Sequence, residues 1–455
     1  MNARSGPGGR GGPLRARTAI VATLVVVAVA MASGVAASAP TAHDGSTAQA
    51  VKLTFMSNAQ SAGIESAWAE LIAAYEKANP NVKLTRIPVA YANYKTTAKL
   101  RASSSSAPDL IEGDSSPGGI LASLATPSLL LPADKYAAKY NWKKTFGPLI
   151  RQLYLSKDGT KVGSGHIYGV PDFAEILGVF YNKSILAKLG LKQPQTFAEF
   201  EASLQKAKSA KVTPLMIGGL DKWPWVHAYS LLADHFASPS AMINWYNAHP
   251  GATIVSAGTT KAATVLQQWV KSGYFEDGAN GVSDGDAVAR FGKGLSLYKI
   301  DGPWETEVNT KALGKNVGFF LLPAAKAGVT PPSTGSMGWD VAITAKSKNP
   351  DAAATFLNFL TTNAARAIIM KHQNPPGAPG PAIGLGSNPV LRTIVESYAH
   401  VLDNGNLVPY LDTANPQVAP NDILANVQSM AAGKMSPADF LKSAQAGWAA
   451  FHNTK

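Results

Sequence analysis

The feature that most constrains the fold is an alternation of strand and helix patterns along the chain. Apolar strand patterns cover residues 51–56, 82–88 and 110–111, and helical patterns cover residues 65–79 and 91–101 between them. Strand–helix–strand order is typical of an α/β unit whose strands pair in parallel. We therefore expect a parallel sheet covered by helices.

A second alternation of the same kind follows farther along the chain. Strand patterns cover residues 177–181, 214–217 and 295–300, and the clearest helical pattern between them covers residues 197–210. A chain of 455 residues is also longer than one hydrophobic core usually serves. The sequence therefore predicts two α/β lobes, with more than one connection between them.

The N-terminus has the pattern of an export leader. A basic stretch ends at Arg17, an apolar run covers residues 19–32, and an A-x-A site follows at 37–39. We predict a signal peptide at 1–39, with an uncleaved anchor as the alternative, and a small, polar linker at 40–50. Either outcome places the working domain outside the cytoplasm, at the outer face of the cytoplasmic membrane or in the medium.

Composition excludes several classes of site. The chain has no cysteine, which removes disulfides, Cys-ligated zinc, iron–sulfur clusters and a lipid-anchored cysteine after the leader. Its formal charge is +12, but Lys and Arg are scattered and form no dense run with interleaved aromatics. We therefore expect no nucleic-acid partner.

The sequence also lacks the motifs that are typical of catalytic and metal sites. There is no H-E-x-x-H, no G-x-S-x-G and no phosphate loop, and His227 and His235 lie too far apart on one helix to hold one metal. We expect no catalytic residue, metal or cofactor. The best enzyme alternative is an exported glycoside hydrolase in which Glu175 and Asp114 meet in a cleft.

Two consecutive motifs carry a resemblance to a known family. Residues 167–171 (IYGVP) and 177–183 (LGVFYNK) resemble the central signature of the family 1 extracellular solute-binding proteins, which include the maltose-type proteins of ABC importers. Phe173 departs from the family pattern, which usually has a small or polar residue there. Further matches follow in the family order at 108–111 (PDLI), 301–304 (DGPW), 338–343 (GWDVAI) and 347–353 (SKNPDAA).

The resemblance implies a two-lobe periplasmic-binding-protein-like fold of type II, with a ligand cleft between lobes joined by a hinge. It implies an N-terminal lobe of residues 51–168 plus 331–378 and a C-terminal lobe of 169–330 plus 379–455. The ligand would lie beyond the carboxyl ends of the strands, as is usual in open α/β sheets. Hinge closure around the ligand is the expected motion.

A sugar site needs flat aromatic faces for the apolar side of the ring and fixed polar groups for the hydroxyls. Ionised acceptors form the stronger hydrogen bonds to those hydroxyls. Residues of both kinds stand where strands or loops meet the expected cleft. The candidate ligand-binding residues are Asn58, Asp114, Glu175, Trp223, Trp225, Trp304, Trp339, Asp340 and Tyr410.

The candidates differ in how much supports them. Trp304 in the Gly-Pro-Trp motif matches a stacking position of the family, and Trp223 and Trp225 flank a proline in a loop expected before a helix. Asp114 and Glu175 match acidic sugar contacts of relatives. A turn or helix cap remains the alternative for Asp114, and a surface glutamate remains the alternative for Glu175.

The resemblance implies a monomer that binds a mono- or oligosaccharide reversibly and delivers it to the transmembrane subunits of an ABC permease. It would not be an enzyme. A solute of another class, such as a polyamine or a polyol phosphate, remains open. A cation would suit Asp114, Glu175 and Asp340, whereas a phosphate ester would require a nearby arginine, for which Arg290 is the nearest candidate.

Overall fold

The computed structural model describes residues 50–415 and 418–453. The predicted signal peptide at 1–39 lies outside the described residues, as does the predicted linker apart from residue 50. Within the part of the chain that is described, no helix has both the length and the apolar character needed to cross a bilayer.

The N-terminal lobe is built on a five-stranded mixed sheet. The strands expected from the first alternation pair in parallel, which confirms that prediction, and the last two strands join antiparallel from later parts of the chain. The strand order is β2 (Val82–Ala90), β1 (Val51–Ala59), β3 (Leu110–Gly113), β13 (Asp340–Ile343) and β6 (Gly169–Pro171).

Helices cover both faces of this sheet. The apolar stripe of α1 (Ala62–Ala78), which includes Trp68 and Tyr75, packs into the core on one face. The helix α2 (Tyr91–Ser103) buries Tyr94 on the other face. The remaining helices of the lobe are α3 (Ile120–Ala125), α4 (Asp134–Lys139), α5 (Trp142–Phe146), α13 (Pro350–Leu360) and α14 (Asn363–Lys371), and its short strands are β4 (Tyr154–Leu155) and β5 (His166–Ile167).

The C-terminal lobe has a four-stranded sheet of its own. Its central strand β8 is apolar and buried along its whole length, because layers of side chains cover both faces of the sheet. The strand order is β11 (Val317–Phe320), β8 (Gly178–Asn182), β10 (Ser296–Asp301) and β9 (Thr213–Met216).

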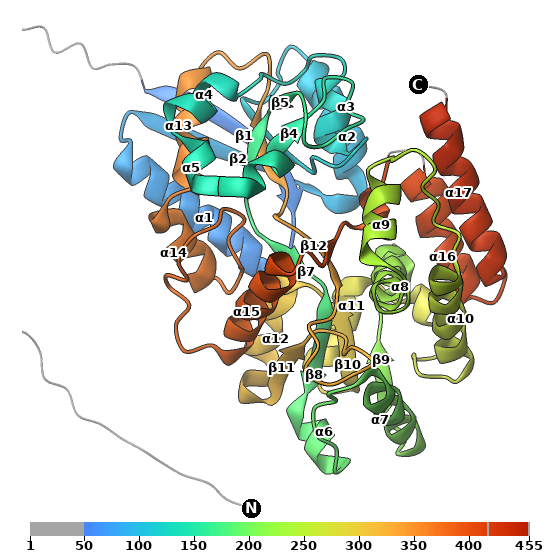
Figure 1. Cartoon of the computed structure of the whole chain (residues 1–455). Coiled ribbons are helices and arrows are strands. Elements are labelled where there is room, and N and C mark those ends of the chain that lie inside the picture. The colour runs from blue at the N-terminus through green and yellow to red at the C-terminus, as the bar shows by residue number, and fades with distance from the viewer. Residues whose placement is uncertain (1–49, 416–417, 454–455) are drawn as a thin grey trace, which may run out of the picture. The chain divides into compact units, whose positions relative to one another are not determined.

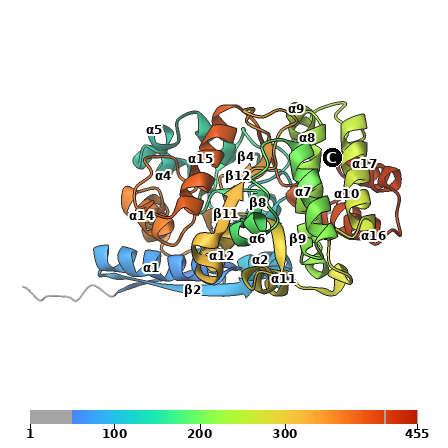
Figure 2. The same cartoon turned by 90° about the horizontal axis from the view of Figure 1, so that it is seen from below.

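Most helices of this lobe form a large core on one face of that sheet, and α11 (Asp284–Gly292) and α15 (Pro389–Asp403) contribute to a smaller core on the other face. The neighbours α8 (Trp223–Phe236) and α10 (Ala257–Lys271) lie side by side in both views (Figure 1 and Figure 2). The other helices are α6 (Lys183–Lys188), α7 (Phe197–Ser209), α9 (Pro239–Tyr246), α12 (Thr306–Leu313), α16 (Ala425–Ala431) and α17 (Pro437–Asn453).

A third, small sheet lies where the chain passes between the lobes. It joins β7 (Glu175–Ile176), β12 (Ser333–Ser336) and β14 (Leu407–Val408), with β12 in the middle. In Figure 1, β7 and β12 stand between the two groups of helices. The chain passes between the lobes at β7 and at β12, and β14 of the C-terminal lobe pairs beside them, so this sheet lies where a hinge is expected.

The first lobe border differs from the expected one. Residues 169–171 were expected to open the C-terminal lobe, but β6 pairs with β13 in the sheet of the N-terminal lobe. We therefore place the first crossing after Pro171. The strand β13 and the helices α13 and α14 pack in the N-terminal lobe, whereas α15, α16 and α17 pack against the sheet and helices of the C-terminal lobe. The expected lobe ranges 331–378 and 379–455 stay a prediction.

Candidate functional site

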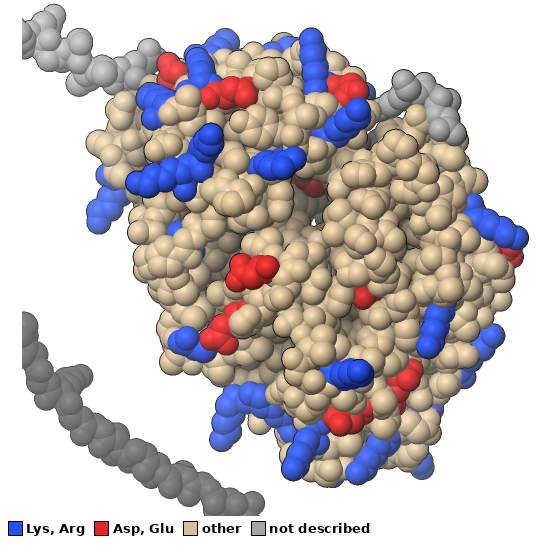
Figure 3. Space-filling model, viewed as in Figure 1, with Lys and Arg blue, Asp and Glu red and all other residues tan. Residues whose placement is uncertain are grey.

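A cavity of about 790 Å³ lies between the two lobes and the small central sheet. Figure 3 shows the hollow at the middle of one face, with acidic atoms inside it and Lys and Arg side chains toward the outer ends of the molecule. Of the nine side chains predicted to bind the ligand, those that line this cavity are Asn58, Asp114, Glu175, Trp223, Trp304, Trp339, Asp340 and Tyr410.

Two paired strands, β3 and β13, bring the carboxyl groups of Asp114 and Asp340 to the same edge of the sheet. Asp114 follows β3, and Asp340 begins β13, whose register sets Asp340 opposite Gly113. The Asp114 side chain also accepts a hydrogen bond of 2.9 Å from the Ile120 N–H at the start of α3. Asp114 therefore lines the cavity and caps a helix at the same time.

Burial changes the protonation of Asp340. It is 4% exposed, and its only protein donor in the described structure is the Ser115 hydroxyl. Burial raises the pKa of Asp340 to about 7, although the Ser115 hydrogen bond works in the opposite direction. Near neutral pH this side chain can therefore either donate or accept a hydrogen bond.

Glu175 reaches the cavity from the central sheet. It lies opposite Ser336 in the β7–β12 pair, and the Ser336 hydroxyl donates a hydrogen bond of 3.1 Å to its carboxyl group. Burial raises the pKa of Glu175 to about 8, and the negative charges of Asp412, Glu112 and Asp114 add to the rise. A ligand that displaces water here meets a carboxyl group that still holds its proton at neutral pH.

The raised pKa of Glu175 predicts a pH dependence of stability. Between its ordinary value of 4.5 and about 8, the unfolded chain loses this proton while the folded chain keeps it. The free energy of unfolding should therefore fall as the pH rises through that interval. Glu175→Gln removes the group, so denaturant unfolding from pH 5 to 8.5 should show a shallower decline than in the wild type. Parallel profiles for the two proteins would contradict the assignment.

Trp304 stands at the junction of the two lobes. It packs against the hydrophobic cores of both lobes and contacts Trp223 edge to face, with ring centroids 6.2 Å apart. The glycine of its motif is explained by this position, because a Cβ at Gly302 would overlap the Trp304 ring. Pro303 begins the short turn that aims the indole.

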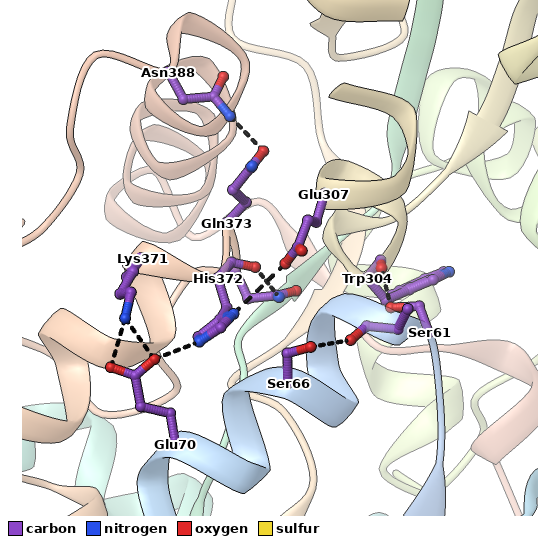
Figure 4. A network of polar contacts seen from close by, with 11 residues as sticks. Ser61, Ser66, Glu70, Trp304, Glu307, Lys371, His372, Gln373 and Asn388 are labelled. Carbon is purple, nitrogen blue, oxygen red and sulfur yellow. Dashed lines mark hydrogen bonds and ion pairs between the residues drawn. The ribbon is translucent and has the colours of Figure 1, made fainter. Parts of the chain in front are cut away.

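A hydrogen bond from the opposite lobe fixes the backbone of Trp304. The Ser61 hydroxyl, which precedes α1, donates to the Trp304 carbonyl at 2.5 Å (Figure 4). Beside it, His372 of the N-terminal lobe lies between Glu70 of α1, at 2.8 Å, and Glu307 of α12, at 3.7 Å. These contacts connect the two lobes along one side of the cavity.

Trp339 forms part of the wall contributed by the N-terminal lobe. Gly338 before it has a φ of +106°, a conformation that glycine adopts without strain, and a Cβ there would overlap the Phe173 carbonyl. The indole packs at a tilt against Tyr91 and Tyr94, with centroids 6.1 Å and 5.8 Å away. The Gly-Trp-Asp motif therefore positions an aromatic surface and a carboxyl group side by side.

The prediction for Trp225 needs correction. Trp223 and Trp225 were expected in a loop, but α8 begins at Trp223 with Pro224 in its first turn, where proline is favourable. The helical turn directs Trp225 into the core, where it is 2% exposed, packs against Phe275 and donates a hydrogen bond of 2.6 Å to Asn280. Trp225 does not line the cavity.

The cavity also contains residues that were not predicted, namely Tyr91, His227, Tyr246 and Asp412. The Asp412 carboxyl group lies 3.7 Å from His227, and both side chains are 6% exposed. Tyr246 hydrogen-bonds Thr413 at 3.1 Å. Asp412 is two residues from the predicted Tyr410, so the loop was found in the sequence although its acid was not.

Some residues that line the cavity have buried polar atoms with no hydrogen-bond partner within the described structure. These atoms are the side-chain oxygen of Asn58, one oxygen of Asp412, the Tyr410 hydroxyl and Nδ1 of His227. Buried polar groups are normally paired, because leaving one unpaired costs about 1–3 kcal/mol. Their convergence in one cavity indicates a site for a polar guest.

Comparisons with known proteins agree with this geometry. A model of the family described as bacterial extracellular solute-binding protein matches residues 58–367. The multiple sugar-binding protein of Streptococcus mutans is 26% identical over 316 residues, which cover 68% of this chain and 70% of that protein.

Solved structures show the fold. A structure described as giving insight into xylan utilization by Caldanaerobius polysaccharolyticus superposes with a TM-score of 0.76 at 22% identity, over 87% of this chain and 99% of that one. A chitin oligosaccharide binding protein superposes with a TM-score of 0.74 at 19% identity, over 88% and 98% of the two chains. The two-lobe fold predicted from the sequence is thereby confirmed.

Proposed function

The chain belongs to the bacterial extracellular solute-binding protein family, and we propose that its cavity binds a mono- or oligosaccharide reversibly. One observation carries this proposal. Three indoles, of Trp223, Trp304 and Trp339, line a cavity that also holds unpaired buried hydrogen-bonding atoms. Flat apolar faces beside polar groups match the two sides of a sugar ring.

The polar groups of the cavity offer different hydrogen-bonding roles to a ligand. Asp340 and Glu175 accept or donate hydrogen bonds according to their protonation, and Asn58 and Tyr410 have free bonding capacity. Hydroxyls of a sugar can satisfy these groups, which an apolar guest would leave unpaired. A site of this kind discriminates strongly against analogues that lack a hydroxyl.

Contacts from both lobes give the ligand a means to change the conformation. Asp114, Trp339 and Asp340 belong to the N-terminal lobe, whereas Trp223 and Trp304 belong to the C-terminal lobe. A ligand that touches both walls binds more tightly when the lobes are close, and only such differential affinity can shift the equilibrium. The central sheet of β7, β12 and β14 is the hinge of this motion.

The rest of the transport cycle follows from the family. We infer that residues 1–39 direct export, that the protein works as a monomer at the outer face of the membrane, and that the closed form delivers the sugar to an ABC permease. Two relatives support this inference. They are the multiple sugar-binding protein of Streptococcus mutans, which supports a sugar as the ligand, and a maltooligosaccharide ABC transporter solute-binding lipoprotein of Streptococcus pneumoniae, which supports an ABC transporter as the partner.

A glycoside hydrolase is the second reading, and the position of Asp114 argues against it. Both oxygens of this carboxyl group already accept hydrogen bonds, from the Ile120 N–H and from the Ser116 hydroxyl. These bonds give Asp114 a structural role at the start of α3 that requires no chemistry at a glycosidic bond. We therefore propose that no bond is broken, and that chromogenic glycosides incubated with the protein release no chromophore.

A thermal-shift screen tests the proposed function. The panel contains sugars, polyols and polyamines, and at least one sugar should raise the melting temperature, because a ligand that binds only the folded state stabilises it. The rise should grow with ligand concentration above the dissociation constant. A panel in which polyamines alone shift the melting temperature would contradict the proposal.

A further inference from the structure

Among the described residues, the Asp, Glu, Lys and Arg side chains that line the cavity are all acidic. Six carboxyl groups line it, and no Lys or Arg is found among the described residues that do so. They come from both lobes and from the central sheet, and are those of Asp114, Glu175, Asp284, Glu305, Asp340 and Asp412.

The protein removes part of this charge, because burial raises the pKa of Glu175, Asp340 and Glu305, and Glu175 still holds its proton at neutral pH. Asp284 forms an ion pair with the buried Lys299 at 2.8 Å, so its charge is compensated within the C-terminal lobe. Asp114, Asp340 and Glu175 receive hydrogen bonds from neutral serine hydroxyls. The repulsion among these groups is visible in Glu175, whose pKa is raised by burial and further by Asp412 and Asp114.

Asp412 has unused hydrogen-bonding capacity. Its side chain is 6% exposed, one of its oxygens has no hydrogen-bond partner, and the other lies 3.7 Å from His227. The buried side-chain oxygen of Asn58 is a second acceptor without a donor. A buried carboxylate without a full set of donors is costly, so a guest that brings donors and positive charge gains the most here.

We propose that the ligand is a sugar that carries a protonated amine, and that its ammonium group binds beside Asp412. An amino sugar supplies the charge that the walls lack, and its ring retains the C–H face that the indoles of Trp223, Trp304 and Trp339 fit. The inference rests on the proposed function and specifies its substrate class. It also predicts rejection of uronic acids and sugar phosphates, because none of the described residues that line the cavity is a Lys or Arg that could receive them.

Titration calorimetry of the wild-type protein at pH 6.5 with matched sugar pairs tests the inference. The pairs are glucosamine and glucose, galactosamine and galactose, and the β-1,4-linked glucosamine dimer and cellobiose. In at least one pair the amino sugar should have a dissociation constant at least about tenfold lower than that of the neutral sugar. This ratio corresponds to a difference in binding free energy of about 1.4 kcal/mol. Spermidine is included as an amine without a ring, and it should bind more weakly than the preferred amino sugar.

A variant then locates the ammonium group. Asp412→Asn keeps the shape of the side chain and removes its charge, so the preference for the amine should fall by at least about fivefold. Asp277→Asn, at an exposed aspartate that does not line the cavity, is the matched control and should leave the preference unchanged.

The outcomes separate this inference from the proposed function. Equal or tighter binding of the neutral member in every pair that binds overturns the inference and leaves sugar binding standing. An unchanged preference in folded Asp412→Asn overturns the placement of the ammonium group. Binding of spermidine alone, or of no compound in the series, overturns the inference and counts against sugar binding as well.

Discussion

Replacing Lys299 by methionine is expected to lower the free energy of unfolding by about 3–5 kcal/mol. Lys299 is 1% exposed in the side chain and pairs with Asp301 and, at 2.8 Å, with Asp284. Burial alone would lower the pKa of Lys299, but the two carboxylates outweigh it and raise the pKa. Without the ammonium group, Asp301 remains buried and uncompensated, and denaturant unfolding at pH 7 measures the loss.

An exposed ion pair provides the matched control for this experiment. Lys83 pairs with Glu76 at 2.9 Å, but its side chain is 64% exposed, so Lys83→Met should change the stability by less than about 1 kcal/mol. Equal losses in the two variants would show that burial does not set the energy of the Lys299 pairs.

The same buried pairs connect the core to the cavity. Asp301 bonds Lys299 and also accepts a hydrogen bond of 2.9 Å from the Gly302 N–H, one residue before the turn that carries Trp304. Lys299→Met should therefore also disturb the position of the indole. We expect a weaker sugar affinity even at temperatures at which the variant remains folded.

Replacing Trp304 by alanine should weaken sugar binding by more than about tenfold, which is at least about 1.4 kcal/mol. The indole lines the cavity and packs against the cores of both lobes, so its removal takes away a stacking face and a contact that spans the lobes. Titration calorimetry measures the affinity, and thermal unfolding verifies that the variant is folded.

Two further variants separate stacking from packing. Trp304→Phe retains an aromatic face and should recover most of the affinity lost by the alanine variant. Trp225→Phe changes a tryptophan of α8 that lies in the core, and it should affect stability more than affinity. An unchanged affinity in folded Trp304→Ala would remove Trp304 from the site.

Long periodic segments were predicted well because their pattern is local. The parallel strands β1, β2 and β3 and the helix between each pair were found within a few residues. The apolar pattern over residues 350–370 is divided between two helices in the structure, because Thr362 caps α14 and accepts a hydrogen bond from the Ala365 N–H. A cap inside an apolar pattern is easily overlooked.

The hinge strands could not be predicted from the sequence. The strands β7, β12 and β14 have two to four residues each, and their pairing joins segments far apart in the chain. Strands this short have too few residues to show an alternation of polar and apolar positions. They form because the lobes on either side bring the three segments together.

The cavity was predicted best where a side chain follows the end of a strand. This rule found Asp114, and the motifs around Trp304 and Asp340 found those two residues. It could not find His227 and Asp412, because a helix and a distant loop become neighbours only in the folded protein. Trp225 was placed at the site because it was expected in a loop, whereas α8 already begins at Trp223.

The central claim is reversible binding of an intact sugar between two lobes. Calorimetric titration with the best sugar of the screen, followed by denaturation of the complex and mass analysis of the released ligand, tests it most directly. We predict one sugar per chain, recovered chemically unchanged, and a smaller radius of gyration in solution scattering once the sugar is bound. A ligand recovered with a cleaved glycosidic bond, or no binding of any sugar to the folded protein, would contradict the account.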